Sequence, residues 1–428
     1  MKLHGHFGKV ILTATLAAVV VLGGSVQAWG RAYKVIHNFQ GTSDGWGPMG
    51  VPAAAKSGDL YGVTLGGGKY DLGTVFKLAA PRNRGGAWTK TVLYNFTHQD
   101  PGYPTSLIIG KDGTLYGAGN GPNTRGFIFR MTPPAPGKRS WHYEVLYQLA
   151  TASEGSNIYN LTLDAAGNLY DSAELGGDMN CSCGTVFELK RPAQKGGQWL
   201  FSVLYTFMGG ADGYEPFAGV TFYQNGDLYG TTVGGGTFGA GTVYRLTPPA
   251  TKGQPWTEAV LYSFDPGANL GSGPASRVTF DESGNLYGTT GFGGDLNCQA
   301  GSGCGVVFEL SPQGGAWTYT NLYSFQGGND GILPEGCLVL DSKGSLYSTT
   351  RTGGGGTGYS GIAFRLSPPA KKGDAWTETV LHRFLVPEGA GDNAGLVWGK
   401  WNELYGVTYL GGTGCPTQGC GTVFELQP

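Results

Sequence analysis

Short hydrophobic blocks separated by turn residues run along most of the chain. Residues 73–78 (GTVFKL), 337–341 (CLVLD) and 376–384 (WTETVLHRF) are rich in β-branched, aromatic and other apolar side chains, and Gly, Pro, Asn or Asp lies near their ends. Such blocks are typical of β-strands joined by tight turns. Because apolar residues do not recur at helical spacing, the pattern predicts an all-β protein.

One block, with the pattern Leu-Tyr-Gly-Thr-Thr, recurs along the chain. It is clearest at residues 285–290 (NLYGTT), with related copies at 59–64, 227–232, 345–350 and 403–408 and weaker ones around Tyr116 and Tyr170. The tyrosines stand at positions 61, 116, 170, 229, 287, 347 and 405, which divides the chain into seven units of 54 to 60 residues. A period of this length indicates a repeat architecture.

Each unit contains four strand-like blocks in a fixed order. An apolar block such as 337–341 comes first, the Leu-Tyr block second, a Gly-Thr-Val-Phe block such as 73–78 third, and a block that begins with Trp, such as 376–384, fourth. Turns such as 281–285 (DESGN) join the first two, and Gly there can adopt the positive φ of a tight hairpin. Seven such units predict a seven-bladed β-propeller of four-stranded antiparallel blades.

The two ends of the chain predict how the ring closes. Residues 33–39 (YKVIHNF) match the outer-strand block of a blade, whereas the last repeat stops just after its third block, residues 421–426 (GTVFEL). We therefore expect the N-terminal strand to complete the last blade, which removes an open sheet edge. An open solenoid is the alternative, but it would require capping repeats.

Residues 1–28 have the features of a secretory signal peptide. Lys2 and Lys9 flank the start of an apolar stretch over residues 10–22, and small residues lead to a cleavage site after Ala28. A membrane anchor is the alternative, but the stretch is shorter than the roughly 20 residues of a spanning helix. We expect secretion to the extracellular space or periplasm, with one propeller domain over residues 29–428 and no transmembrane segment in it.

Six of the seven cysteines lie in close pairs. The pairs are Cys181 with Cys183, Cys298 with Cys304, and Cys415 with Cys420. In an oxidising compartment such neighbours form local disulfides. A zinc site is the alternative, but the pairs belong to different repeats and have no His nearby. We expect the seventh cysteine, Cys337, to act as a small buried hydrophobic residue.

Composition excludes several classes of protein. With 40% hydrophobic residues the chain can build a core, which excludes a disordered protein. The 79 glycines do not recur at every third position, which excludes collagen. A formal net charge of −2 lacks the basic excess of a nucleic-acid-binding domain, so we expect no nucleic-acid partner. We expect a monomer.

The combination of blocks resembles a known tandem repeat. The Leu-Tyr-Gly-Thr-Thr, Gly-Gly, Gly-Thr-Val-Phe and Trp-x-x-x-x-Leu-Tyr-x-Phe blocks, in this order over residues 33–428, are similar to the GloVer repeat of secreted or surface proteins from the Gloeobacter and Verrucomicrobia groups. The resemblance implies a secreted bacterial protein with a propeller-like fold. It implies no catalytic residues.

Strand order in a propeller sorts the loops onto two faces. The loops between second and third strands, and the loops that lead into the next blade, lie together on one face, here named the top face. It carries the sequences 44–46 (DGW), 100–103 (DPGY), 212–214 (DGY) and 330–332 (DGI). Acidic and aromatic side chains should therefore gather there.

These residues predict a ligand surface, because aromatic rings can stack on sugar rings beside carboxylate acceptors. The candidates are Asp44, Trp46, Tyr103, Asp212, Tyr214 and Asp330. The alternative for each Asp is ordinary turn chemistry, in which the carboxylate bonds to its own backbone. Calcium would need six to eight oxygen ligands, more than Asp178 with Asn180 or Asp295 with Asn297 offers. We predict no metal and no cofactor.

One further candidate breaks the repeat. Aligning the innermost strands at the position of Cys337 places Arg277 as the one charged residue among seven equivalents. If this position borders the central channel, Arg277 could hold a carboxylate or sulfate through two hydrogen bonds. The alternative is a salt bridge to a neighbouring blade.

Catalytic signatures are sparse. The sequence shows no Ser-His-Asp arrangement, zinc-binding His pair or phosphate-binding loop. Our interpretation is a binding or interaction module for an extracellular glycan or protein that uses the top face. A hydrolase or lyase that cleaves polysaccharides through paired carboxylates is the first alternative. A structural protein of the cell envelope, without a concave site, is the second.

Overall fold

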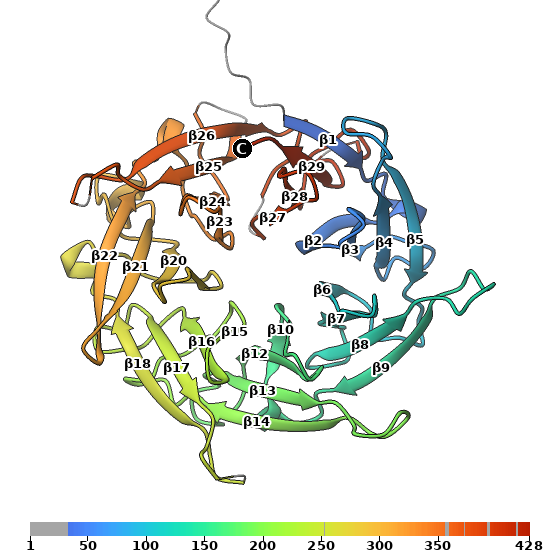
Figure 1. The fold of residues 1–428 in the computed structure, drawn as a ribbon, viewed down its shortest axis with the longest axis horizontal. Coiled ribbons are helices and arrows are strands. Elements are labelled where there is room, and N and C mark those ends of the chain that lie inside the picture. The colour runs from blue at the N-terminus through green and yellow to red at the C-terminus, as the bar shows by residue number, and fades with distance from the viewer. Residues whose placement is uncertain (1–32, 252, 356–358, 372, 392–393, 417) are drawn as a thin grey trace, which may run out of the picture. The chain divides into compact units, whose positions relative to one another are not determined.

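The computed structural model describes residues 33–251, 253–355, 359–371, 373–391, 394–416 and 418–428. The signal peptide predicted for residues 1–28 lies outside these residues. The described residues form seven antiparallel sheets that follow one another around a ring (Figure 1). The prediction of an all-β, seven-bladed propeller is confirmed.

Blades one to four follow the chain from the inside of the ring outwards. Their strands are β2 (Trp46–Ala54), β3 (Leu60–Gly66), β4 (Thr74–Ala79) and β5 (Thr89–Asn95); β6 (Pro104–Ile109), β7 (Leu115–Gly119), β8 (Phe127–Thr132) and β9 (His142–Gln148); β10 (Ser156–Ile158), β11 (Thr162–Leu163), β12 (Leu169–Leu175), β13 (Thr185–Lys190) and β14 (Leu200–Thr206); and β15 (Thr221–Tyr223), β16 (Asp227–Thr232), β17 (Thr242–Thr247) and β18 (Thr257–Ser263).

Blades five to seven complete the ring. Their strands are β19 (Thr279–Phe280), β20 (Leu286–Thr290), β21 (Val306–Gln313) and β22 (Ala316–Ser324); β23 (Val339–Leu340), β24 (Leu346–Thr349), β25 (Tyr359–Ser367) and β26 (Thr377–Leu385); and β27 (Val397–Trp398), β28 (Leu404–Thr408), β29 (Thr422–Leu426) and β1 (Tyr33–Asn38). Short 3-10 turns occur in the loops, namely η1 (Thr42–Asp44), η2 (Ala152–Glu154), η3 (Pro266–Ala268), η4 (Gln299–Gly301) and η5 (Gly328–Asp330).

The N-terminal strand closes the ring as predicted. β1 pairs antiparallel with β29, with Tyr33 opposite Leu426 and Val35 opposite Phe424. In Figure 1 the blue β1 lies beside β29 at the outer edge of blade seven. Phe39, which follows β1, is fully buried and packs with Phe76 of blade one at a ring-centroid distance of 5.2 Å. The closing strand therefore contributes to the core between blades seven and one.

The glycine of the Leu-Tyr-Gly block is explained by a close approach inside each blade. Gly62 in β3 lies opposite Phe76 in β4, and a Cβ at Gly62 would stand 2.6 Å from Phe76 Cζ. In three other blades a Phe of the third strand covers the equivalent glycine, with Phe129 over Gly117, Phe308 over Gly288 and Phe424 over Gly406. Glycine lets the ring lie directly against the backbone in these blades. Blades three and six depart from this rule, with Asp171 and Ser348 at the equivalent position.

Neighbouring blades are joined by an aromatic pair that repeats. In five blades the Trp near the start of the outer strand packs edge-on against the Tyr of the Leu-Tyr block in the preceding blade, as Trp88 does on Tyr405 at 5.4 Å between ring centroids. Equivalent pairs join Trp141 to Tyr61, Trp199 to Tyr116, Trp317 to Tyr229 and Trp376 to Tyr287. These tryptophans are packing residues between blades, and offset aromatic pairs of this kind add about 0.5–1.5 kcal/mol each beyond their buried area.

Blade three differs from the prediction in its innermost strand, which is split into β10 and β11. Between them, the Asn160 N–H donates to Asp171 Oδ2 at 3.0 Å, and the Asn160 carbonyl accepts from Arg277 Nη2 at 2.6 Å. The main chain of Asn160 thus bonds to side chains in place of a neighbouring strand. Both side chains break the repeat, which is why a regular four-strand pattern does not describe this blade.

All three predicted disulfides are present on the loops between second and third strands. They join Cys181 to Cys183, Cys298 to Cys304, and Cys415 to Cys420. Three disulfides indicate an oxidising environment, either extracellular or periplasmic. Cys337 is free and half-buried on the wall of the central channel. Within the described ranges, no helix has the length and hydropathy to cross a membrane.

Candidate functional site

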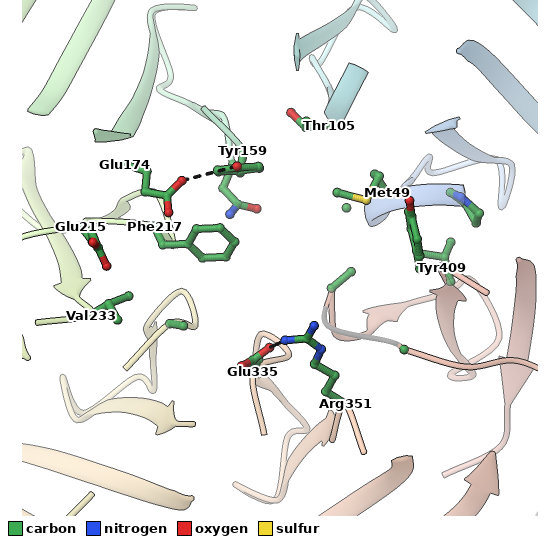
Figure 2. A pocket seen from close by; sticks show the side chains of 17 residues that line it. Met49, Thr105, Tyr159, Glu174, Glu215, Phe217, Val233, Glu335, Arg351 and Tyr409 are labelled. Atoms are coloured by element: carbon green, nitrogen blue, oxygen red, sulfur yellow. Dashed lines mark hydrogen bonds and ion pairs between the residues drawn. The ribbon is translucent and has the colours of Figure 1, made fainter. Parts of the chain in front are cut away.

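A cavity opens at the centre of the top face, where the innermost strands of all seven blades converge. It encloses about 300 Å³, and we name it the central mouth. The side chains that define it are described below and shown in Figure 2. Most of them come from two positions of the repeat, where the side chain differs in almost every blade, and Glu215 comes from a turn next to these positions.

The first position follows a sharp turn into the innermost strand. In every blade the turn residue has a positive φ, between 52° and 66°, and in five blades Pro follows it. The turn residue's N–H donates to a carbonyl in the preceding blade, as Glu215 does to Cys183 at 3.0 Å. The side chain two residues later then points into the central mouth. These side chains are Met49, Thr105, Tyr159, Phe217, Ala275 and Glu335.

The second position is the residue after the Thr-Thr end of the Leu-Tyr block. The Arg351 N–H donates to the Leu333 carbonyl at 2.9 Å, and the Val233 N–H donates to the Glu215 carbonyl at 3.0 Å. Each bond places this residue next to the turn that precedes the first position. The side chains that reach the central mouth from here are Glu174, Val233, Arg351 and Tyr409.

Charged side chains lie on two sides of the central mouth. Glu335 pairs with Arg351 at 3.5 Å between Oε2 and Nη1 on one side (Figure 2). Burial raises the pKa of Glu335, and Arg351 opposes that shift. Glu174 and Glu215 lie on the other side. Burial raises the pKa of Glu215, and the charge of Glu174 raises it further, because two nearby carboxylates disfavour each other's ionisation.

Aromatic rings lie next to the Glu174–Glu215 side. The rings of Tyr159 and Phe217 are 4.7 Å apart between centroids. The Tyr159 hydroxyl donates to Glu174 Oε2 at 3.4 Å, and the Asn157 amide donates to the same oxygen at 3.1 Å. Burial and the Glu174 charge raise the pKa of Tyr159 to about 12, so its hydroxyl stays a donor at neutral pH. The central mouth thus combines apolar ring faces with hydrogen-bonding groups.

Below the central mouth the channel continues as a second cavity of about 440 Å³, lined mostly by the innermost strands. Arg277 lies in its wall, so this position does border the channel, and Asn160 lines both cavities. The Arg277 guanidinium donates across the channel to the carbonyls of Asn160 and Leu161, at 2.6 and 3.2 Å. Its hydrogen-bond partners among the described residues are thus main-chain carbonyls of blade three. A carbonyl carries no net charge, so these contacts differ from the salt bridge to a neighbouring blade that was the alternative.

Asp171 lies beside this contact and is fully buried. Burial raises its pKa to about 7, against hydrogen bonds from main-chain N–H groups and the charge of Arg277, which lower it. The buried Tyr244 hydroxyl of blade four has no hydrogen-bond partner among the described residues. Burial raises the pKa of that phenol, and the Asp171 charge raises it further. Blades three, four and five therefore share a buried polar cluster where the repeat is broken.

The acidic candidates lie in loops away from the central mouth. Asp212 accepts from the Tyr205 hydroxyl at 3.1 Å and from the Met208 N–H at 2.8 Å, and Asp330 accepts equivalent bonds from Tyr323 and Gln326. In both loops the carboxylate closes its own turn. This matches the turn chemistry weighed as the alternative to ligand binding.

Asp44 closes its loop with a different partner. It accepts from His37 Nε2 at 3.0 Å and the Gln40 N–H at 2.9 Å, and it pairs with Lys90. Although burial opposes the shift, the bonds from His37 and Lys90 lower the pKa of Asp44 to about 2. It is therefore ionised throughout the ordinary pH range.

The aromatic candidates are half-buried rather than exposed. Trp46 packs over Gly66 and donates from Nε1 to Asp71 at 2.9 Å, and Tyr214 covers Gly234. Tyr103 occupies the positive-φ turn of blade two, with φ 52°. These three side chains lie outside the described lining of the central mouth. Whether they bind a ligand stays a prediction.

Sequence reasoning missed the central mouth. Its side chains carry no motif, and each appears once. The signal that could have found them is the variation itself, because aligning the seven repeats shows that the residue after Thr-Thr reads Leu65, Asn120, Glu174, Val233, Gly291, Arg351 and Tyr409. A position that varies inside an otherwise repeated block does not make the same packing contact in every blade, and such variation indicates a candidate site.

Comparisons with known proteins agree with the fold. A family model described as the Gloeobacter/Verrucomicrobia repeat matches residues 24–196 and 182–424. No curated protein matches the chain. A solved structure of a candidate 6-phosphogluconolactonase from Bacteroides uniformis is 15% identical, with a TM-score of 0.50, over 78% of this chain and 84% of that one.

Two other solved structures are similar over a larger share of the chain. A gluconolactonase from Xanthomonas campestris is 14% identical, with a TM-score of 0.40, over 92% of this chain and 89% of that one. The soluble aldose sugar dehydrogenase of Escherichia coli is 12% identical, with a TM-score of 0.44, over 93% and 99%.

Proposed function

This chain belongs to the Gloeobacter/Verrucomicrobia repeat family, and from that premise we propose that it is a secreted binding module that takes an extracellular glycan in the central mouth of its top face. Removal of residues 1–28 would release it as a single propeller domain. The three disulfides fit a protein that works outside the cytoplasm.

One observation carries the proposal. The framework of the blades repeats, whereas the two positions that line the central mouth change from blade to blade. The positions that pack within and between blades keep the same residue type in most blades, so wide variation at positions that line a cavity is consistent with a role other than packing. A concave site with aromatic walls and a few polar groups is the usual form of a small-ligand site.

The chemistry of the lining suits a sugar. Ring faces such as Phe217 can cover the apolar C–H face of a pyranose. The carboxylates of Glu174 and Glu215 can accept hydrogen bonds from hydroxyl groups, and Arg351 can donate them. The volume of about 300 Å³ is near the lower end of ligand cavities, which favours the end of a chain over an internal stretch.

A second candidate function is cleavage of a glycosidic bond in the same cavity. Glu215 has a raised pKa next to Glu174, and a protonated acid beside an ionised carboxylate is the pair that glycosidases use. In that case Glu215 would protonate the leaving oxygen, and Glu174 would act as base or nucleophile.

The test is a glycan array probed with the secreted protein, followed by product analysis of every glycan that binds. Binding without new reducing or unsaturated ends supports the module. Binding with such ends favours the enzyme. If no glycan binds, the proposal fails, and a protein ligand or an envelope role replaces it.

A further inference from the structure

The charges of the central mouth are not balanced. Four charged side chains line it, three acidic and one basic. Glu335 and Arg351 neutralise each other through their ion pair. Among the described residues, neither Glu174 nor Glu215 has a cationic partner within salt-bridge distance. The side of the cavity formed by blades three and four therefore carries net negative charge.

The two carboxylates differ in how well they are satisfied. Glu174 Oε2 accepts from the Asn157 amide and the Tyr159 hydroxyl. In the described part of the chain no group donates a hydrogen bond to the Glu215 side chain, although this residue is half-buried and stands in a turn with φ 57°. Two neighbouring carboxylates repel each other, and a cation placed between them would relieve that repulsion.

An apolar wall stands next to these carboxylates. Figure 2 shows Phe217 and Tyr159 on the same side of the cavity as Glu174 and Glu215. Rings in that position can cover the apolar face of a hexose and attract a positive charge at their own faces. The opposite side offers Arg351 and Tyr409, which can bond to hydroxyl groups of the same ring.

We infer that the glycan carries a protonated amine, so that the ligand class is an amino sugar with a free amino group at the end of a chain. This inference rests on the proposed function. The ammonium group lies between the Glu174 and Glu215 carboxylates, and the sugar ring stacks on Phe217. An N-acetylated sugar has no positive charge to place there, so both carboxylates would stay without a cationic partner.

The experiment is calorimetric titration of the intact protein with four probes. They are the β-1,4-linked trimers of glucosamine, N-acetylglucosamine and glucose, and trilysine. We expect the glucosamine trimer to bind at least about 10-fold more tightly than the others, the factor that follows from one charge-assisted hydrogen bond. If a neutral trimer binds as tightly, the inference is overturned while glycan binding stands. If trilysine binds as tightly, the sugar is not what is recognised. If nothing binds, the proposed function fails as well.

Two variants make the test independent of folding. Glu215→Gln keeps the shape of the side chain and removes its charge, so it should reduce the preference for the glucosamine trimer about 10-fold while the neutral trimers bind as before. Glu282→Gln removes the same charge from an exposed hairpin on the opposite face and should leave the preference unchanged. Equal loss in both variants would mean that only the overall charge matters and would overturn the inference.

Discussion

Arg277 Nη2 and the Asn160 carbonyl form a hydrogen bond of 2.6 Å across the central channel, between blades five and three. The two residues are far apart in sequence, and each occupies a position where the repeat is broken. The bond satisfies a carbonyl that has left the strand ladder, and it fixes the floor of the central mouth because Asn160 lines both cavities.

Replacing Arg277 tests this bond. Arg277→Met should lower the free energy of unfolding by about 1–2 kcal/mol, because the part-buried carbonyls of Asn160 and Leu161 lose their charged donor. Arg139→Met removes an exposed Arg from a loop and should change it by less than about 0.5 kcal/mol. Urea denaturation measures both. Equal values would show that the cross-channel bond adds nothing.

Asp171 predicts the direction in which stability changes with pH. Its pKa is raised in the folded state from an ordinary 3.8 to about 7, so the folded protein holds the proton more tightly than the unfolded chain. This contribution to stability is complete below pH 4 and is lost as pH rises to 7 and above. Glu258 and Glu378, each with a pKa raised by burial to about 7, act in the same direction.

We therefore expect the melting temperature to fall between pH 5 and pH 8. Asp171→Asn should flatten this slope because it removes one of the carboxyl groups whose pKa is raised by burial, whereas Glu282→Gln, which changes an exposed carboxylate, should leave it as in the wild type. An Asp171→Asn variant that keeps the full slope would contradict the assignment of a raised pKa to Asp171.

Asp330 tests whether the loop acids serve the fold. Asp330→Ala removes the acceptor for the Tyr323 hydroxyl and the Gln326 N–H, so it should cost about 1–3 kcal/mol of unfolding free energy. Glycan affinity should stay within about twofold. A stable protein with lost affinity would return Asp330 to the ligand surface that the sequence predicts.

The repeat explains why so much of the fold could be predicted. Because each block recurs in seven units, every copy is independent evidence for the same strand and the same packing. The block at residues 33–39, which has no unit of its own, indicates how the ring closes. Trp88 and its equivalents could be assigned to packing for the same reason. The central mouth could not be predicted this way, because Glu174, Phe217 and Arg351 each occur once and depend on three-dimensional convergence.

The role of the acidic loop residues can be read from the sequence only when each acid is compared with the residue seven positions before it. Asp212 and Asp330 each bond to a Tyr seven residues earlier, Glu154 does the same with Tyr147, and His37 takes the place of Tyr for Asp44. The Asp-Gly pattern alone suggests both a turn and a ligand surface. The aromatic partner at fixed spacing favours the turn, and ligand binding by these acids stays a prediction.

Weakening the contact that closes the ring should lower the free energy of unfolding. Phe39→Ala should lower the free energy of unfolding by about 3–5 kcal/mol, because this fully buried ring links the closing strand to blade one. Lys34→Ala, at an exposed position of the same strand, should change it by less than about 0.5 kcal/mol. Denaturation of both variants decides whether the closing strand is part of the cooperative fold.

The central claim is that the ligand binds in the central mouth rather than elsewhere on the top face. The most direct measurement is the affinity of the tightest-binding glycan for two variants that lose the same ring, Phe217→Ala in the cavity and Phe238→Ala at an exposed loop of the same face. We predict a loss of at least about 10-fold for Phe217→Ala, as expected when a ring whose burial contributes about 1.5–3 kcal/mol is removed, and no change for Phe238→Ala. Full affinity in Phe217→Ala, or a loss confined to Phe238→Ala, would contradict the account.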